Sequence, residues 1–179
     1  MLLDIHFYGD PILRKHCAPI KEITEEVRTL AKNMIYTMDK SNGCGLAAPQ
    51  VGHSIRLFVC RSYILGEKGT WSLAPPQVYI NPKLSSPGQR ILVDNEGCLS
   101  IPKLRLEIER PDSIVIEALD LEGSPIREEL EGYNARIRMH ENDHINGVLF
   151  IDRLDVKARK KIEPFLRELK RNLKSTDKV

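Results

Sequence analysis

Two histidines and a glutamate near the C-terminal end of the chain, His140, Glu141 and His144, have the spacing of a hydrolytic metal site. Residues four positions apart on a helix stand about one turn apart on the same face, so both imidazoles can bind one ion. A glutamate beside the first histidine can then take a proton from a metal-bound water. The pattern predicts a metal-dependent hydrolase and leaves open what completes the site.

The third metal ligand decides the class of hydrolase, because catalytic sites of this type normally use three protein ligands and keep one position for water. Phe150 stands where one large group of metalloproteases has its third histidine, and phenylalanine cannot bind a metal. Glu163, nineteen residues after His144, is a candidate, although Pro164 follows it directly and the surrounding segment is strongly basic. Cys98 is the other candidate, because a thiolate in a Gly-flanked turn is exposed enough to reach an ion. An endoprotease that uses Glu163 therefore stays open as an alternative.

Two further motifs join the histidine motif in a resemblance to a known family. Residues 43–50 (GCGLAAPQ), 96–100 (EGCLS) and 140–144 (HENDH) resemble the three signature motifs of the peptide deformylases, in the same order and at similar separations. The resemblance implies one divalent metal ion held by Cys98, His140 and His144. It also implies Fe(II) as the metal in the cell, with Zn(II), Ni(II) or Co(II) able to substitute.

The reaction implied by this resemblance is removal of the formyl group from the N-terminal formylmethionine of nascent polypeptides, with release of formate. Glu141 would accept the proton of the attacking water and return it to the leaving amine. The Gln50 side-chain amide and the Leu99 backbone N–H would donate hydrogen bonds to the oxyanion that forms on the formyl oxygen.

The glycines of the motifs lack side chains, so backbone can lie close to the formyl group and to an extended peptide. They are Gly43, Gly45 and Gly97. Arg105 could contact the backbone or a carboxylate of the bound peptide. Glu96 and Asp143 could orient the ligand histidines, directly or through Arg110, or could form plain surface salt bridges.

Two residues depart from the family pattern. Met139 stands where a glutamine often precedes the first histidine, and Arg136 stands where many bacterial members have an aliphatic residue near the pocket for the methionine side chain. The run at residues 132–137 instead resembles the branch that includes the organellar deformylases.

The elements that position these motifs belong to an α+β fold. The resemblance and the residue patterns predict antiparallel strands around a central metal-binding helix, with an N-terminal and a C-terminal helix, in one catalytic domain over residues 1–179. Thr24 can cap the first helix, whose apolar stripe runs from Val27 to Met38. The metal-binding helix begins near Gly132. The last helix spans residues 155–174 and should kink or restart at Pro164.

Strands are expected at residues 55–60, 78–80, 83–85, 90–93, 104–109, 113–119 and 125–130, most simply as an antiparallel meander. A turn that carries Cys98 is expected to interrupt them at residues 94–102. Residues 61–77 resemble a long surface loop, and loops of this length are uncommon and often cover a site. Both a lid and mere decoration therefore stay open for this segment.

Composition indicates the cellular compartment of the protein more clearly than it indicates the binding partners. The formal net charge of +2 is too small to indicate nucleic acid or an anionic membrane by itself. The N-terminus lacks the pattern of a signal peptide, and no apolar run approaches the roughly 20 residues of a membrane span. We expect a cytoplasmic protein with four reduced cysteines and without a membrane or DNA partner.

The segment from Arg153 to Val179 is basic, with ten Lys or Arg against four Asp or Glu. Such a run is more often a solvated helix face than a nucleic-acid contact. It could nevertheless hold the enzyme on the ribosome near the emerging chain. A metal-stabilised module that only docks on ribosomal RNA is a further alternative, but purely structural coordination would not require a base at Glu141.

Overall fold

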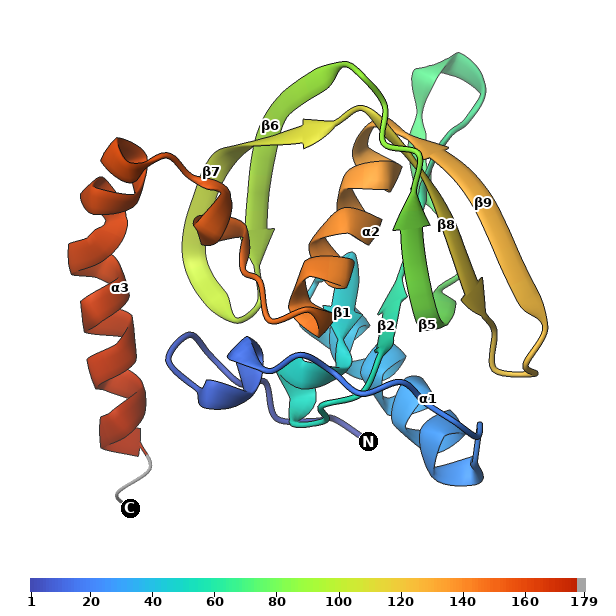
Figure 1. Cartoon of the computed structure of the whole chain (residues 1–179), viewed down its shortest axis with the longest axis horizontal. Helices are drawn as coiled ribbons and strands as arrows, with labels where there is room; N and C mark the ends of the chain where they lie inside the picture. The colour runs from blue at the N-terminus through green and yellow to red at the C-terminus, as the bar shows by residue number, and fades with distance from the viewer. Residues whose placement is uncertain (177–179) are drawn as a thin grey trace.

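A central helix surrounded by antiparallel strands forms the body of the computed structural model, which describes residues 1–176 (Figure 1). The central helix is α2 (Gly132–Ile145). Within the described residues the strands form a five-stranded sheet in the order β1-β2-β5-β8-β9 and two separate hairpins, β3–β4 and β6–β7. The predicted α+β class with a central helix is confirmed.

The strands, in chain order, are β1 (Gly45–Ala47), β2 (Leu57–Cys60), β3 (Tyr63–Leu65), β4 (Trp71–Leu73), β5 (Gln77–Ser85), β6 (Ile91–Cys98), β7 (Ile101–Pro111), β8 (Ser113–Leu119) and β9 (Pro125–Glu131). The outer helices are α1 (Glu25–Lys40) and α3 (Val156–Thr176). Short 3-10 helices lie at Pro11–Arg14 (η1), Ala48–Val51 (η2), Glu67–Gly69 (η3) and Phe150–Arg153 (η4).

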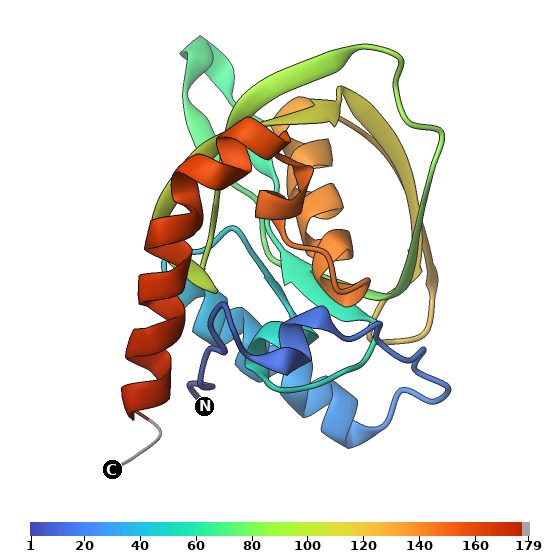
Figure 2. The same ribbon diagram turned by 60° about the vertical axis from the view of Figure 1, so that its left-hand side comes forward.

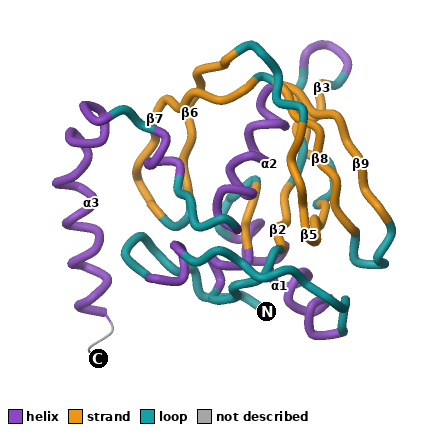
Figure 3. Tube along the Cα trace, viewed as in Figure 1, coloured by secondary structure: helices purple, strands orange, loops and turns teal. Residues whose placement is uncertain are grey.

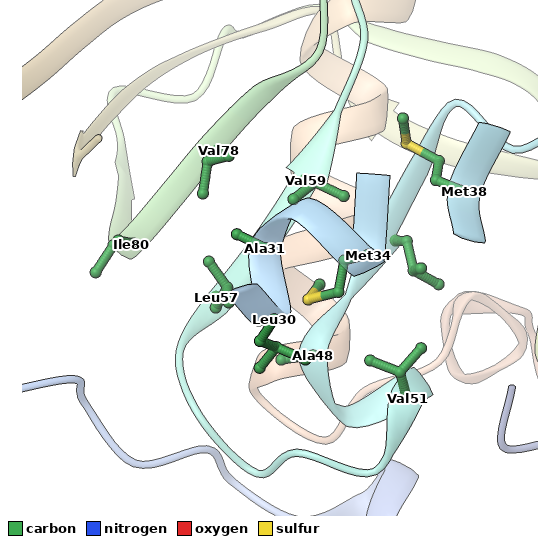
Figure 4. Packing of buried hydrophobic residues seen from close by; sticks show 11 residues of the cluster. Leu30, Ala31, Met34, Met38, Ala48, Val51, Leu57, Val59, Val78 and Ile80 are labelled. Atoms are coloured by element: carbon green, nitrogen blue, oxygen red, sulfur yellow. The ribbon is translucent and has the colours of Figure 1, made fainter. Parts of the chain in front are cut away.

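The first helix, α1, begins at the cap that its sequence predicts. The Thr24 side chain accepts a hydrogen bond from the Val27 N–H, and Asn42 adopts a φ of +54° just after the C-terminus. Its inner face buries Met34 and Met38. They belong to one apolar cluster with Val59 of β2 and with further residues of β1, β2 and β5 (Figure 4). This core fixes the position of the residues that follow α1, which include the 43–50 motif.

The central helix α2 has no single apolar face, because most of its residues are buried on several sides. Figure 3 shows strands around it, and it contacts β1, β2, β8 and β9. Two arginines are fully or almost fully buried on it, Arg136 and Arg138. Arg138 donates to the Tyr79 hydroxyl (2.9 Å) and to Ser62 Oγ (2.7 Å), so its charge is held by neutral oxygen atoms beneath the β3–β4 hairpin.

Three expectations about the strands are wrong. Residues 61–77 are not an unstructured loop, because they contain the β3–β4 hairpin, in which Tyr63 pairs with Leu73. The strands do not form one meander, since β6 and β7 pair only with each other in the described part of the chain. The expected turn over residues 94–102 is also shorter than predicted: β6 continues to Cys98, and only Leu99 and Ser100 turn the chain.

The last helix, α3, is continuous through Pro164 rather than split in two. Figure 2 shows that its first turns run at an angle to the rest, as the missing N–H of a proline in a helix allows. Leu166 is buried in a cluster with Leu13 and Phe150, whereas the apolar Val156 in the first turn is exposed. Residues 177–179, which the basic segment includes, lie outside the described residues.

Among residues 1–176, the structure contains no helix with both the length and the apolar character needed to cross a bilayer.

The packing of α1 can be tested with Met34→Ala. Met34 has no exposed surface, so the substitution should lower the free energy of unfolding by about 2–5 kcal/mol, the usual cost of such a cavity. Lys32→Ala on the exposed side of the same helix is the matched control and should change it by less than about 0.5 kcal/mol. Urea titration measures both values, and equal effects would contradict the packing of α1 described above.

Candidate metal centre and substrate pocket

Three segments from different parts of the chain meet at one side of α2. The helix itself carries His140, Glu141 and His144. Cys98 ends β6 at the turn into β7, and Gln50 lies in η2, directly after β1. The three sequence motifs are therefore brought together by the fold.

The side chains of Cys98, His140 and His144 form a cluster that could hold one metal ion. Each offers one donor atom, and these atoms all lie within 4.8 Å of one another. The Cys98 Sγ is 3.3 Å from His144 Nε2. Glu163, the alternative third ligand, instead lies on α3 near Arg159 (3.5 Å) and Arg167 (3.3 Å), outside this cluster.

The charges around the cluster fit a bound cation. Burial opposes a protonated His140, but hydrogen bonds with Cys98 and Glu96 raise the pKa of this histidine well above its usual range, so its neighbours favour positive charge here. Burial lowers the pKa of His144, which favours the neutral imidazole that binds metals. Among the described residues, the buried Glu141 Oε2 has no hydrogen-bond partner. A thiolate with two imidazoles suits both zinc and Fe(II).

A buried ion network holds His140 in place. Glu96 Oε2 lies 2.9 Å from His140 Nδ1, which leaves Nε2 of the ring as its other nitrogen for a metal. Arg110 donates to both oxygens of Glu96 (2.6 and 2.8 Å) and to Asp143 (2.8 Å). Burial alone would raise the pKa of Glu96, but the hydrogen bonds with Arg110 and His140 hold it below its usual range. Glu96 and Asp143 thus lie where they can orient the residues of the cluster, and the ion pairs that they form with Arg110 are buried rather than on the surface.

Arg136 belongs to the same network. It donates to Glu96 Oε1 (2.7 Å) and to the carbonyl oxygens of Ile108 and Leu92, so it ties α2 to both strands of the β6–β7 hairpin. Sequence reasoning placed this residue only near the pocket for the methionine side chain. The position of Arg136 in the middle of a helix predicted to be buried was the available sign that it must have buried partners.

The Gln50 side chain is fixed with its amide nitrogen toward the cluster. Its Oε1 accepts from the Ala47 N–H (2.8 Å), which leaves Nε2 to donate to Ser100 Oγ (3.1 Å) and to face Cys98 Sγ at 3.5 Å. Ser100, which sequence reasoning did not single out, therefore helps to orient this amide.

Glu141 lies against the backbone of β1. A Cβ atom added to Gly45 would overlap the Glu141 carboxylate, so only glycine allows this close approach. Burial raises the pKa of Glu141 to about 7, which is near neutrality. The predicted base is therefore next to the predicted metal ligands and is shielded from water.

An open pocket leads to the cluster. Its lining includes all four residues predicted to bind substrate, Gly43, Gly45, Gly97 and Arg105, together with Gln50, Leu99 and Glu141. The Arg105 side chain passes over Gly97, where an added Cβ would lie 3.4 Å from Arg105 Cγ. Cys44, Lys103 and Tyr133 also line the pocket, and sequence reasoning gave none of them a role there.

Comparison with known proteins agrees with these motifs. The family model for polypeptide deformylase matches residues 2–160. A peptide deformylase of Psychrobacter cryohalolentis is 42% identical over 170 residues, which is 93% of this chain and 89% of that protein. Among solved structures, a plant peptide deformylase aligns with a TM-score of 0.88 and 35% identity, and covers 99% of this chain and 94% of the plant chain. A class I type b peptide deformylase of Acinetobacter baumannii with bound Met-Ala-Ser aligns with a TM-score of 0.79 and 31% identity, and covers 86% and 99%.

The two candidates for the third ligand are distinguished by Cys98→Ala and Glu163→Ala. Loss of Cys98 should reduce bound metal from about one ion per chain to a small fraction, since two imidazoles alone form an incomplete site. Loss of Glu163 should leave the metal content unchanged. Metal analysis after dialysis against a weak chelator gives both values, and the opposite pattern would identify Glu163 as the ligand.

Proposed function

The chain belongs to the polypeptide deformylase family, and from this premise we propose how its own residues carry out the reaction. The reaction is the metal-dependent removal of the formyl group from the N-terminal formylmethionine of nascent polypeptides, with release of formate. The observation that carries the proposal is the convergence of Cys98, His140 and His144 with the buried Glu141 at the base of an open pocket. The relative from A. baumannii was solved with Met-Ala-Ser, a peptide without the formyl group.

Cys98, His140 and His144 would hold the ion. When bound, a divalent metal ion in such a site supplies Lewis-acid chemistry that activates a water molecule as the nucleophile. We propose Fe(II) as the metal in the cell, with Zn(II), Ni(II) or Co(II) able to substitute. The thiol and imidazole donors are compatible with each of these ions, and the preference for iron rests on the family resemblance.

Glu141 is the proposed base. Its carboxylate lies next to the ligand histidines and to the backbone of Gly45, so it can take a proton from the attacking water and pass it to the leaving amine. The Nε2 group of Gln50 and the backbone N–H of Leu99 are the proposed donors to the oxyanion. The Gln50 amide is already oriented by Ala47 and Ser100, which reduces the reorganisation needed when negative charge develops.

The substrate is proposed to lie as an extended peptide between the segment at residues 43–45 and the end of β6. Gly43, Gly45 and Gly97 leave room for its backbone, and Arg105 lies at the mouth of the pocket to contact it. We further propose that residues 1–179 form one catalytic domain, that the enzyme works in the cytoplasm, and that it has no membrane or DNA partner.

Glu141→Gln tests the base while it keeps the shape of the side chain. Formate release from formyl-Met-Ala-Ser should fall by about 10²–10⁴-fold, because the proton acceptor is removed. Metal content should stay at the level of the parent protein. Glu107→Gln on the exposed face of β7 is the matched control and should keep the parent rate. A parent protein without activity, or equal rates in parent and Glu141→Gln, would refute the proposal.

The C-terminal helix is proposed to dock on the ribosome. Its apolar residues, which include Leu166, pack on the domain, and most of its cations before residue 172 are exposed, although the Lys170 stem also lies against Gly9. The exposed ones are Lys157, Lys160, Lys161, Arg167, Lys170 and Arg171. Removing the whole helix would uncover the core, and point substitutions are therefore the better test.

The combined variant Lys160→Glu, Lys161→Glu and Lys170→Glu should weaken ribosome binding. The slope of the logarithm of affinity against the logarithm of salt concentration should become less steep by about one for each substituted lysine that binds a phosphate in the parent protein. A control with the same charge change, Lys21→Glu, Lys32→Glu and Lys83→Glu, alters exposed lysines elsewhere. Sedimentation with ribosomes measures binding, and equal affinity of both variants would rule out docking through α3.

A further inference from the structure

The mouth of the pocket carries two cations that have no carboxylate partner in the described part of the chain. Lys103 and Arg105 both line the pocket and both are exposed. Lys103 lies in the irregular part of β7, between Ile101, which pairs with Cys98, and Arg105, which pairs with Gly97. From Arg105 onward the strand is regular, and alternate residues share one face. Within residues 1–176 neither side chain forms an ion pair. The next two residues on this face, Glu107 and Glu109, lie outside the pocket lining. The charge along the strand is thus positive at the pocket and negative beyond it.

The other charges of the pocket do not neutralise this rim. The acidic residues of the lining are Glu96 and Glu141, and both are buried at its base. Glu96 is already paired with Arg110 and Arg136. The rim therefore presents its positive charge to whatever enters the pocket.

Lys103 occupies a backbone conformation that does not favour a lysine. Its φ is +65°, in the left-handed region, where the Cβ atom of an L-residue lies too close to the following carbonyl oxygen. Glycine would adopt the same conformation without this contact. The lysine is consequently not explained by the stability of the turn, and its charge at the pocket mouth is the property that glycine could not supply.

We propose that Lys103 and Arg105 make the enzyme prefer peptides that carry a carboxylate side chain one to three residues after the formylmethionine. This inference rests on the proposed function and names a substrate class for the same site. An extended chain advances roughly 3.3 Å per residue, so the side chains that follow the formylmethionine reach from the pocket to its rim. The preference is electrostatic, and salt should weaken it because both cations are exposed to solvent.

The test compares amidated formyl-Met peptides in matched pairs, with Asp or Asn at the second, third or fourth position and alanine elsewhere. Amidation removes the terminal carboxylate, so only the chosen side chain carries negative charge. For at least one position, kcat/KM of the metal-loaded enzyme should be about two- to tenfold higher for Asp than for Asn, which is the range that one or two exposed ion pairs supply. At about 1 M salt, where the screening length is about 3 Å, the ratio should approach one.

Variants assign the preference to the rim. Lys103→Glu should reduce the Asp-to-Asn ratio to one or below, and the ratio within each variant cancels any general loss of activity. Lys103→Gly should also reduce the ratio, while thermal unfolding stays at or above the parent temperature, which excludes misfolding as the cause. Lys32→Glu, with the same charge change on α1, should keep the parent ratio.

Two results would overturn the inference: equal kcat/KM for Asp and Asn at all three positions, or a preference for Asp that Lys103→Glu leaves intact. Failure of the proposed function gives a different result, because the parent enzyme would then release no formate from the Asn peptides either.

Discussion

The site depends on the buried ion pairs that join the β6–β7 hairpin to the central helix. In the described residues this hairpin pairs with no strand of the five-stranded sheet, so its side chains must fix its position. Arg110, which is 1% exposed, binds Glu96 of β6 and Asp143 of α2 at the same time. Removal of one member of such a pair generally costs about 3–5 kcal/mol, because the remaining charge is buried without a partner. The position of Cys98 relative to the two histidines follows from this contact.

The same network reaches the predicted metal cluster through one side chain, the imidazole ring of His140. His140 offers one nitrogen to Glu96, and Arg110 and Arg136 in turn hold the carboxylate of Glu96. Each of these three partners restricts the orientation of the ring, and oriented ligands bind metals more tightly than mobile ones. The network would be expensive in a core that served stability alone, because ion pairs carry a large desolvation penalty. Its position around the cluster fits the proposed role of His140 as a metal ligand held in one orientation.

Charge is arranged in layers along the pocket. The base combines a thiol, two imidazoles and the buried Glu141, and it favours a cation. The wall includes backbone at Gly45 and Gly97: a Cβ atom at Gly45 would collide with Glu141, whereas one at Gly97 would only touch Arg105. The rim is positive. A substrate with a neutral reacting end and an acidic side chain further along would satisfy all three layers.

The sequence by itself predicted the type of site and determined much of the local structure. The spacing of His140, Glu141 and His144 and the cap at Thr24 are encoded within a few residues, so patterns reveal them. The three motifs also predicted the family. The separate β3–β4 hairpin and the failure of the meander could not be read in this way, because strand pairing depends on contacts between distant residues.

The spacing alone left the third ligand open, the family resemblance favoured Cys98, and the tertiary structure places Cys98 rather than Glu163 beside the two histidines. Cys98 and Glu163 are both compatible with the spacing, but the β6–β7 hairpin turns at Leu99 and Ser100 and places Cys98 at the cluster, while α3 carries Glu163 away. The sequence likewise did not indicate the roles of Arg136 and Lys103. A charged residue is normally predicted to lie on the surface, and its partners, or their absence, are known only from the three-dimensional structure. The sequence specifies which groups are available, and the fold decides which of them meet, because buried charges must find partners that are distant along the chain.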